Sequence, residues 1–121
     1  MKYMLLIYME EDAMSETERA QCYVKSAQLA QQLHANGQFR ATAPLLPAAQ
    51  TQTVQVRGGT PLITDGPFAE TREQLGGFFL IEAQDLDEAI EVAGQIPGAR
   101  VGTVEIRPVI ELPGLPPSQF A

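Results

Sequence analysis

The distribution of apolar and polar residues along the chain predicts a β-strand followed by an amphipathic helix. Residues 3–9 are apolar at nearly every position, which is typical of a strand buried on both faces. Ser15 and Glu18 have the spacing of a capping box, so a helix is expected to begin there. It continues to about Asn36, and Gly37 supplies its C-terminal stop. Because one broad arc of this helix is apolar, one of its sides is expected to be buried.

The rest of the chain predicts a hairpin, further strands and a second helix. Asp85 and Glu88 have the spacing of another capping box, and Thr71 with Gln74 predicts a single helical turn. The remaining predicted elements are a strand at 38–46 that prolines interrupt, a hairpin at 51–64 that turns at Gly58–Gly59, a strand at 76–83, a helix at 84–98 and a strand at 102–112.

This order indicates an α+β fold. Without the inserted β-hairpin it is the ferredoxin-like βαββαβ arrangement, an antiparallel sheet with two helices on one face. We expect one domain over residues 1–110 and a proline-rich C-terminal tail over residues 111–121. Two helices cover only one face of the sheet, yet the strands at 3–9 and 76–83 are apolar on both. A second copy, a ligand or both must therefore cover the other face, and we predict a homodimer whose sheets enclose a cavity.

The net charge and composition of the chain exclude several classes of binding partner. The 121-residue chain carries a net charge of −7, from 15 acidic and 8 basic residues. Nucleic acid and an anionic membrane surface are therefore not expected as partners. No apolar run reaches the ~18 residues of a membrane span, and the apolar N-terminus continues into acidic residues without a cleavage site. The single cysteine, Cys22, excludes an internal disulfide and fits the cytoplasm.

The segment "TDGPFAETREQLGGFFLIEAQDLDEAIEVA", with "GTVEIRPV" after it and "MKYMLLIY" at the start, resembles the DGPF-type proteins of the YCII-related family. The resemblance runs to about Val109 and implies a dimeric α+β barrel without a settled function. Members are often encoded beside extracytoplasmic-function sigma factors, which implies a regulatory or stress setting. An aspartate and a helix histidine have been proposed as the family's acid–base pair. Asp65 fills the first position, whereas the second falls near Ser26 and His34 lies about two turns further on.

Asp65 has two interpretations. A carboxylate at a strand end facing an apolar cavity would have a raised pKa and could act as a general acid or base. The sequence Asp-Gly-Pro is equally the chemistry of a turn, in which Asp accepts a local backbone N–H. Arg72 could bind a substrate carboxylate through two hydrogen bonds, or pair with neighbouring glutamates.

Three further residues are candidates for a ligand-binding site. Phe68 is an apolar anchor for the loop or for a pocket wall, Tyr8 offers a hydroxyl, and His34 is either an acid–base residue or a packed helix-end histidine. One histidine and one cysteine do not make a zinc site, and no calcium loop or phosphate-binding loop occurs. We therefore expect no metal and no cofactor.

Three functions remain open. The first is a cytoplasmic homodimer that binds a small apolar or carbonyl-bearing molecule in its cavity. The second is a cofactor-free enzyme of isomerase or hydrolase type that uses Asp65 as general acid or base. The third is a structural or interaction protein.

Overall fold

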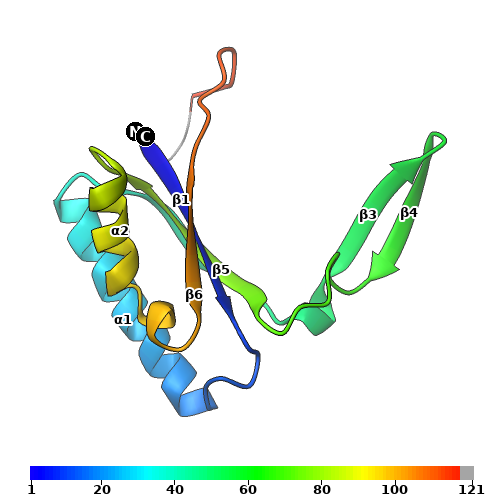
Figure 1. Ribbon diagram of the computed structural model, residues 1–121, viewed down its shortest axis with the longest axis horizontal. Helices are drawn as coiled ribbons and strands as arrows, with labels where there is room; N and C mark the ends of the chain where they lie inside the picture. Colours follow the sequence, from blue (N-terminus) through cyan, green and yellow to red (C-terminus); the bar gives the residue numbers. More distant parts are fainter. Residues whose placement is uncertain (118–121) are drawn as a thin grey trace.

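A computed structural model describes residues 1–117 of the chain, and its elements follow the expected order (Figure 1). The elements are β1 (Lys2–Met9), α1 (Glu16–Ala35), β2 (Phe39–Pro44), the 3-10 turn η1 (Ala48–Gln50), β3 (Gln52–Arg57), β4 (Thr60–Asp65), β5 (Gln74–Glu82), α2 (Leu86–Gln95), the 3-10 turn η2 (Pro97–Arg100) and β6 (Thr103–Pro108).

Capping explains where α1 begins and ends. The Ser15 hydroxyl accepts a hydrogen bond from the Glu18 backbone N–H at 3.2 Å, and the Glu18 carboxylate accepts one from the Ser15 backbone N–H at 3.0 Å. This is the reciprocal capping box that the sequence predicts. After the helix, Gly37 takes a positive φ of 74°, which a residue without a Cβ adopts at little cost.

The second helix has a simpler cap than expected. The Asp85 carboxylate accepts from the Glu88 backbone N–H at 2.9 Å, as predicted. The Glu88 carboxylate instead accepts a hydrogen bond from the Gln38 amide at 2.7 Å and so ties α2 to the segment before β2. The prediction of a complete second box was therefore wrong, because a tertiary partner takes the Glu88 side chain.

Strands β1, β2, β5 and β6 form one antiparallel sheet in the order β2-β5-β1-β6. With the β3–β4 hairpin set aside, this is the ferredoxin-like order, which confirms the predicted α+β fold class. β5 carries an extra residue opposite the end of β1, since Ile7 pairs with Gly77 and Tyr8 pairs with Leu75. Such a bulge bends the strand locally, and here it lies where the sheet borders the cavity described below.

Both helices pack on one face of this sheet, where the core lies. The largest fully buried side chains are Leu5 of β1, Phe79 and Ile81 of β5, and Ile96 after α2. Each such side chain contributes roughly 1.5–3 kcal/mol when it leaves water. Leu29 and Leu33 supply the buried side of α1. The predicted amphipathic helix is thus buried mainly through its C-terminal half.

The opposite face of the sheet carries no helix, as the count of apolar faces implied (Figure 1). Met4, Leu6 and Tyr8 of β1 lie on this face beside Phe78 and Leu80 of β5, and all five are half-buried. Its charges are balanced, since Lys2 and Arg107 lie on the same face as Glu82 and Glu105. Two further side chains form ion pairs with this group, Arg40 with Glu82 and Glu111 with Lys2. We call this surface the helix-free face.

The β3–β4 hairpin forms a separate two-stranded sheet that projects from the body on the side of the helix-free face (Figure 1). Gly58 and Gly59 make its turn with φ values of 58° and 79°, as the sequence predicts. Beyond it, residues 66–73 contain no helix, so the predicted turn over Thr71 to Gln74 was wrong. The Gln74 amide instead donates to the Thr71 carbonyl. The tail over residues 109–117 contains no strand or helix, and residues 118–121 of the predicted tail lie outside the described residues.

Candidate functional site, a cavity beside the first helix

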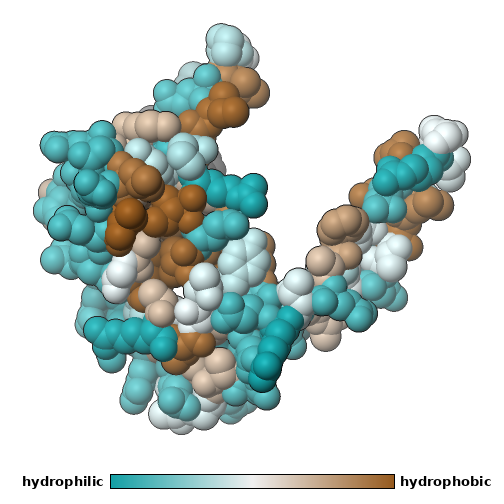
Figure 2. Space-filling model, viewed as in Figure 1, coloured by the Kyte–Doolittle hydropathy of each residue, from teal (hydrophilic) through white to brown (hydrophobic). Residues whose placement is uncertain are grey.

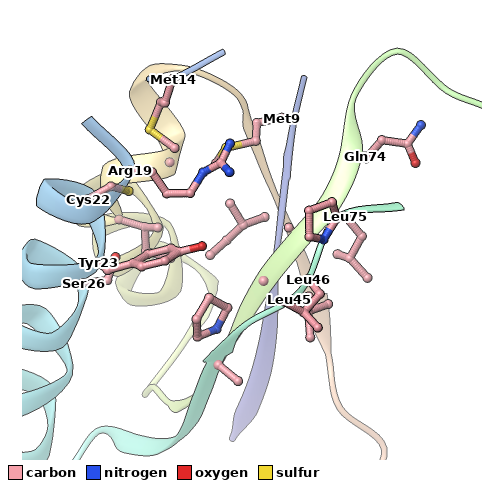
Figure 3. Close-up of a pocket in the computed structure, with 18 of the residues that line it drawn as sticks. Met9, Met14, Arg19, Cys22, Tyr23, Ser26, Leu45, Leu46, Gln74 and Leu75 are labelled. Carbon is pink, nitrogen blue, oxygen red and sulfur yellow. The ribbon is translucent and has the colours of Figure 1, made fainter. Parts of the chain in front are cut away.

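A cavity of about 480 Å³ lies between the N-terminal half of α1 and the adjacent end of the sheet (Figure 3). Its wall is formed by α1, by the ends of β1 and β2, by the start of β5 and by η2. Most of the wall is apolar. The apolar side chains that line it include Ile7, Met9, Met14, Leu45, Leu46, Leu75 and Phe79.

Close backbone packing shapes the end of the cavity near η2. A Cβ at Gly98 would lie 2.7 Å from the Ile7 Cγ2 atom, so only glycine leaves room for that side chain in the wall. A Cβ at Gly102 would lie 2.0 Å from the carbonyl oxygen of Tyr8. This contact holds the end of β1 against the start of β6, and Met9 continues from there into the cavity wall.

Three polar side chains of α1 face the cavity together. Arg19, Tyr23 and Ser26 follow one another at intervals of four and three residues, which places them on one side of a helix. Figure 3 shows Arg19 and Tyr23 extending from α1 toward the space, with Leu45 and Leu75 on the opposite side. The Arg19 Nη2 atom donates to the Glu11 carbonyl oxygen at 3.0 Å. Within residues 1–117 Arg19 forms no ion pair, so most of its donors stay available to a ligand.

The loop after β1 is anchored beside the cavity. The Glu11 carboxylate accepts a hydrogen bond from the Ala48 backbone N–H at 2.7 Å, which satisfies a free donor at the start of η1. Arg72 forms an ion pair with Glu10 and lines a second, polar pocket of about 380 Å³. That pocket shares Glu10, Glu11 and Gln74 with the cavity wall. Arg72 is 87% exposed, so this pair contributes little to stability.

The structure places Asp65 outside the wall of the cavity. It is the last residue of β4, is exposed, and accepts a hydrogen bond from the Gln52 side-chain amide at 3.3 Å. Gly66 follows with a φ of 98°, and its backbone N–H donates to the Thr51 carbonyl oxygen at 2.7 Å. The Asp-Gly-Pro segment therefore makes the turn at the base of the hairpin.

The other predicted ligand-binding residues are dispersed. Phe68 is 81% exposed in the loop after the hairpin, and Tyr8 lies on the helix-free face. His34 lies at the C-terminal end of α1, exposed, with its ring edge-on to Phe39 at 6.5 Å between centroids. Of the predicted set, Arg72 lines the polar pocket that borders the cavity.

Sequence reasoning missed Arg19, Tyr23 and Ser26 as a group. The available signal was their helical spacing at the less buried N-terminal end of α1, where polar side chains interrupt the apolar arc. Ser26 is also the residue near the position where the family resemblance places a histidine. That position therefore lies in the cavity wall, and this chain carries a hydroxyl there.

Shifted pKa values occur at the surface, away from the cavity. Hydrogen bonds from the Ser15 backbone and side chain lower the pKa of Glu18. The hydrogen bond to Glu105, at 3.0 Å, raises the pKa of Arg107 on the helix-free face. Within the described residues no group of three or more His, Cys, Asp or Glu side chains could hold a metal ion. No helix among them is long and apolar enough to cross a membrane.

The fold and the cavity define a ferredoxin-like α+β protein with an apolar pocket beside its first helix. The chain belongs to the YCII-related family, whose domain matches residues 1–113. It is 40% identical over 85 residues to an uncharacterized protein of Rhizobium meliloti, a match that covers 68% of each chain. Among solved structures it resembles the 5-chloro-2-hydroxyhydroquinone dehydrochlorinase of Burkholderia phenoliruptrix in complex with 2,5-dihydroxybenzoquinone. That match has a TM-score of 0.57 and 14% identity, and covers 91% of this chain and 94% of the other. At this identity the likeness supports the fold alone.

Proposed function

We propose that this protein is a cytoplasmic homodimer that binds a small, largely apolar molecule carrying a carbonyl or similar oxygen. The cavity beside α1 carries the proposal. Its volume of about 480 Å³ falls within the ~300–1,000 Å³ of pockets that hold small molecules. Such pockets are typically apolar with a few polar groups that orient the ligand, and this one has that composition.

The wall indicates how a ligand would be oriented. The apolar side chains of β1, β5 and the segment after β2 would cover the body of the ligand. On the other side, the Arg19 guanidinium offers planar N–H donors that suit a carbonyl, phenolate or carboxylate oxygen. The hydroxyls of Tyr23 and Ser26 would donate to or accept from the same part of the ligand. Selectivity would then favour flat oxygen-bearing molecules over plain hydrocarbons.

The helix-free face supports the homodimer. Five half-buried apolar side chains lie together there, among charges that balance. Two chains that each carry a net charge of −7 repel one another, so a neutral, apolar face is the favourable place for contact. The sigma-factor setting remains an implication of the family resemblance.

The second candidate is a cofactor-free enzyme. Its support is the fold shared with a dehydrochlorinase, together with Asp65 as the general acid or base. In the single chain Asp65 lies at the hairpin base, outside the cavity wall. Catalysis by Asp65 on a ligand in this cavity therefore requires the hairpin base to move toward it, or a second chain to bring its own Asp65.

A fluorescent probe tests the cavity. The apolar anion 8-anilinonaphthalene-1-sulfonate suits both the apolar wall and Arg19. We expect one saturable probe site per chain, from which 2,5-dihydroxybenzoquinone displaces the dye. Ser26→Phe fills the cavity and should weaken probe binding at least tenfold. Gln28→Phe, at an exposed position of the same helix outside the wall, is the matched control. Equal probe binding by the two variants would refute the cavity as the binding site.

A further inference from the structure

The β3–β4 hairpin is an arm with one apolar face. The register pairs Val54 with Ile63 and Val56 with Pro61, so these four side chains lie together on one face of the ribbon. Val54, Val56 and Ile63 are 61%, 60% and 66% exposed. Figure 2 shows apolar side chains along the projecting arm. We call this set of four residues the apolar arm face.

The arm lacks the support that a ribbon of this kind needs. β3 and β4 pair with each other and with no strand of the main sheet. An isolated two-stranded hairpin is at best marginally stable in water, and a third strand or a packed apolar face is needed to hold it. Something outside the single chain must therefore cover the apolar arm face, or the arm would not keep its regular pairing.

The total surface points to the same conclusion. The chain has a mass of 13.2 kDa and exposes 8475 Å². A compact folded monomer of this mass exposes about 6,400 Å². The excess of about 2,000 Å² is larger than the ~800 Å² that each partner buries in a standard stable interface. Segments that stand away from the body, the arm among them, produce this excess, and it leaves enough surface for a standard interface.

Position and charge identify the partner. The arm projects on the same side of the sheet as the helix-free face, and the space-filling view shows a hollow between the arm and the body (Figure 2). The arm carries one positive and one negative residue, Arg57 and Asp65, and the helix-free face is balanced too. Both surfaces are thus neutral on a chain whose net charge is −7. A strongly basic partner would be attracted to the acidic remainder of the chain. A second copy is repelled by that acidic surface, but not by the neutral arm and helix-free face.

We propose that the arm clasps the second copy of this chain, with the apolar arm face packed on the subunit that covers the helix-free face. The inference rests on the proposed homodimer and adds how that dimer is held. By symmetry each subunit contributes one arm, so loss of the apolar arm face removes two contacts from each dimer. The base of the arm, at Thr51 and Gly66, lies close in sequence to Leu46 and Ala48 of the cavity wall. Contact between the arm and the second copy would therefore also restrict the motion of the nearby cavity wall in both subunits.

The test keeps the ribbon intact while it changes one face. Val54→Lys with Ile63→Glu places opposite charges on a directly paired position, which preserves cross-strand attraction and the net charge. The control is Gln55→Lys with Thr64→Glu, which puts the same charges on the other face of the same ribbon at diagonally neighbouring positions, since Gln55 pairs with Leu62 and Thr64 with Thr53. Sedimentation equilibrium of the wild type and both variants, over a range of concentrations, gives the dimer dissociation constant of each. Circular dichroism confirms that each variant folds.

We expect a wild-type dimer, a control within about threefold of it, and a dissociation constant raised at least 100-fold in the Val54→Lys/Ile63→Glu variant. A 100-fold change corresponds to about 2.8 kcal/mol. If the wild type dimerises and both variants dimerise equally well, the arm is not the clasp, while the proposed homodimer stands. If the wild type is monomeric at every concentration, the homodimer and the clasp both fail, and the probe experiment still decides the cavity separately.

Discussion

One pair of substitutions tests the packing that shapes the cavity. Gly102→Ala and Gly94→Ala make the same chemical change at two glycines with different surroundings. A Cβ at Gly102 would lie 2.0 Å from the Tyr8 carbonyl oxygen and 2.8 Å from the Met9 Cβ atom. A Cβ at Gly94, in α2, would meet no atom within 4 Å. The structure therefore predicts effects of opposite sign.

The magnitudes follow from these contacts. Overpacking commonly costs about 1–3 kcal/mol, and Gly102 should reach the upper end because its neighbour is backbone that cannot rotate away. Gly94→Ala should stabilise the protein by about 0.5–1 kcal/mol, since alanine loses less conformational freedom in a helix. For a domain of this length 1 kcal/mol shifts Tm by about 4 °C. Gly102→Ala should thus lower Tm by about 12 °C, and Gly94→Ala should raise it by about 2–4 °C.

Thermal unfolding followed by far-UV circular dichroism measures both effects. All samples need the same protein concentration, because dimerisation would make Tm depend on it. Because the end of β1 continues into the cavity wall, Gly102→Ala should also weaken binding of 8-anilinonaphthalene-1-sulfonate, whereas Gly94→Ala should not. A Tm for Gly102→Ala within 2 °C of the wild type would show that the close approach of β1 to β6 is not a constraint.

Three further predictions concern the cap of α1 and the core. Ser15→Ala should cost about 1 kcal/mol in urea denaturation, because the Glu18 backbone N–H loses its acceptor. The lowered pKa of Glu18 means that its contribution to stability is present above the ordinary pKa of 4.5 and is lost as pH falls through the lowered value. Glu18→Gln should therefore flatten the pH dependence of stability below about pH 5, and an unchanged slope would refute the linkage. Leu5→Ala, at a site with 0% exposure, should cost about 2–5 kcal/mol with an unchanged m-value.

The elements of the fold could be predicted because their signals are local. Ser15 with Glu18 marks the start of α1, and Gly58–Gly59 marks the hairpin turn, through contacts within a few residues. Apolar runs on both faces of β1 and β5 also disclosed the helix-free face, since two helices can cover only one side. The resemblance to the YCII-related family covers most of the chain, and the family match over residues 1–113 confirms it.

The failures arise where a side chain with capping-box spacing finds another hydrogen-bond partner. Glu88 satisfies the spacing of a capping box, but its carboxylate meets Gln38, fifty positions earlier in the chain. Thr71 and Gln74 also have that spacing, but their side chains bond to nearby carbonyls and no helical turn forms. Neither outcome can be predicted from the spacing alone, because the spacing does not say which other donors and acceptors lie within reach of each side chain.

The candidate site was harder to predict than the fold. The conspicuous Asp65 and Phe68 lie at and after the base of the arm, whereas the cavity is bordered by inconspicuous residues of α1. Arg19 gave no signal in the sequence, since one arginine among the glutamates of a first helical turn resembles an ordinary surface residue. Arg19 becomes a candidate binding residue only in the fold, because the segment after β2 places Leu45 and Leu46 in the wall of the same cavity.

The hydrogen bond between Gly66 and Thr51 closes the base of the arm before the hairpin begins. The chain therefore leaves the core and returns to it at almost the same point, and residues 52–65 behave as an insertion. Related chains could lengthen or shorten this insertion without shifting the register of any core strand. One residue added to each strand at the base would turn the ribbon over and present its other side, which carries Gln55 and Arg57 but also Leu62, because side chains alternate along a strand. Under the proposed clasp, a change in arm length would alter the contact between copies while the cavity and its supporting core stay unchanged.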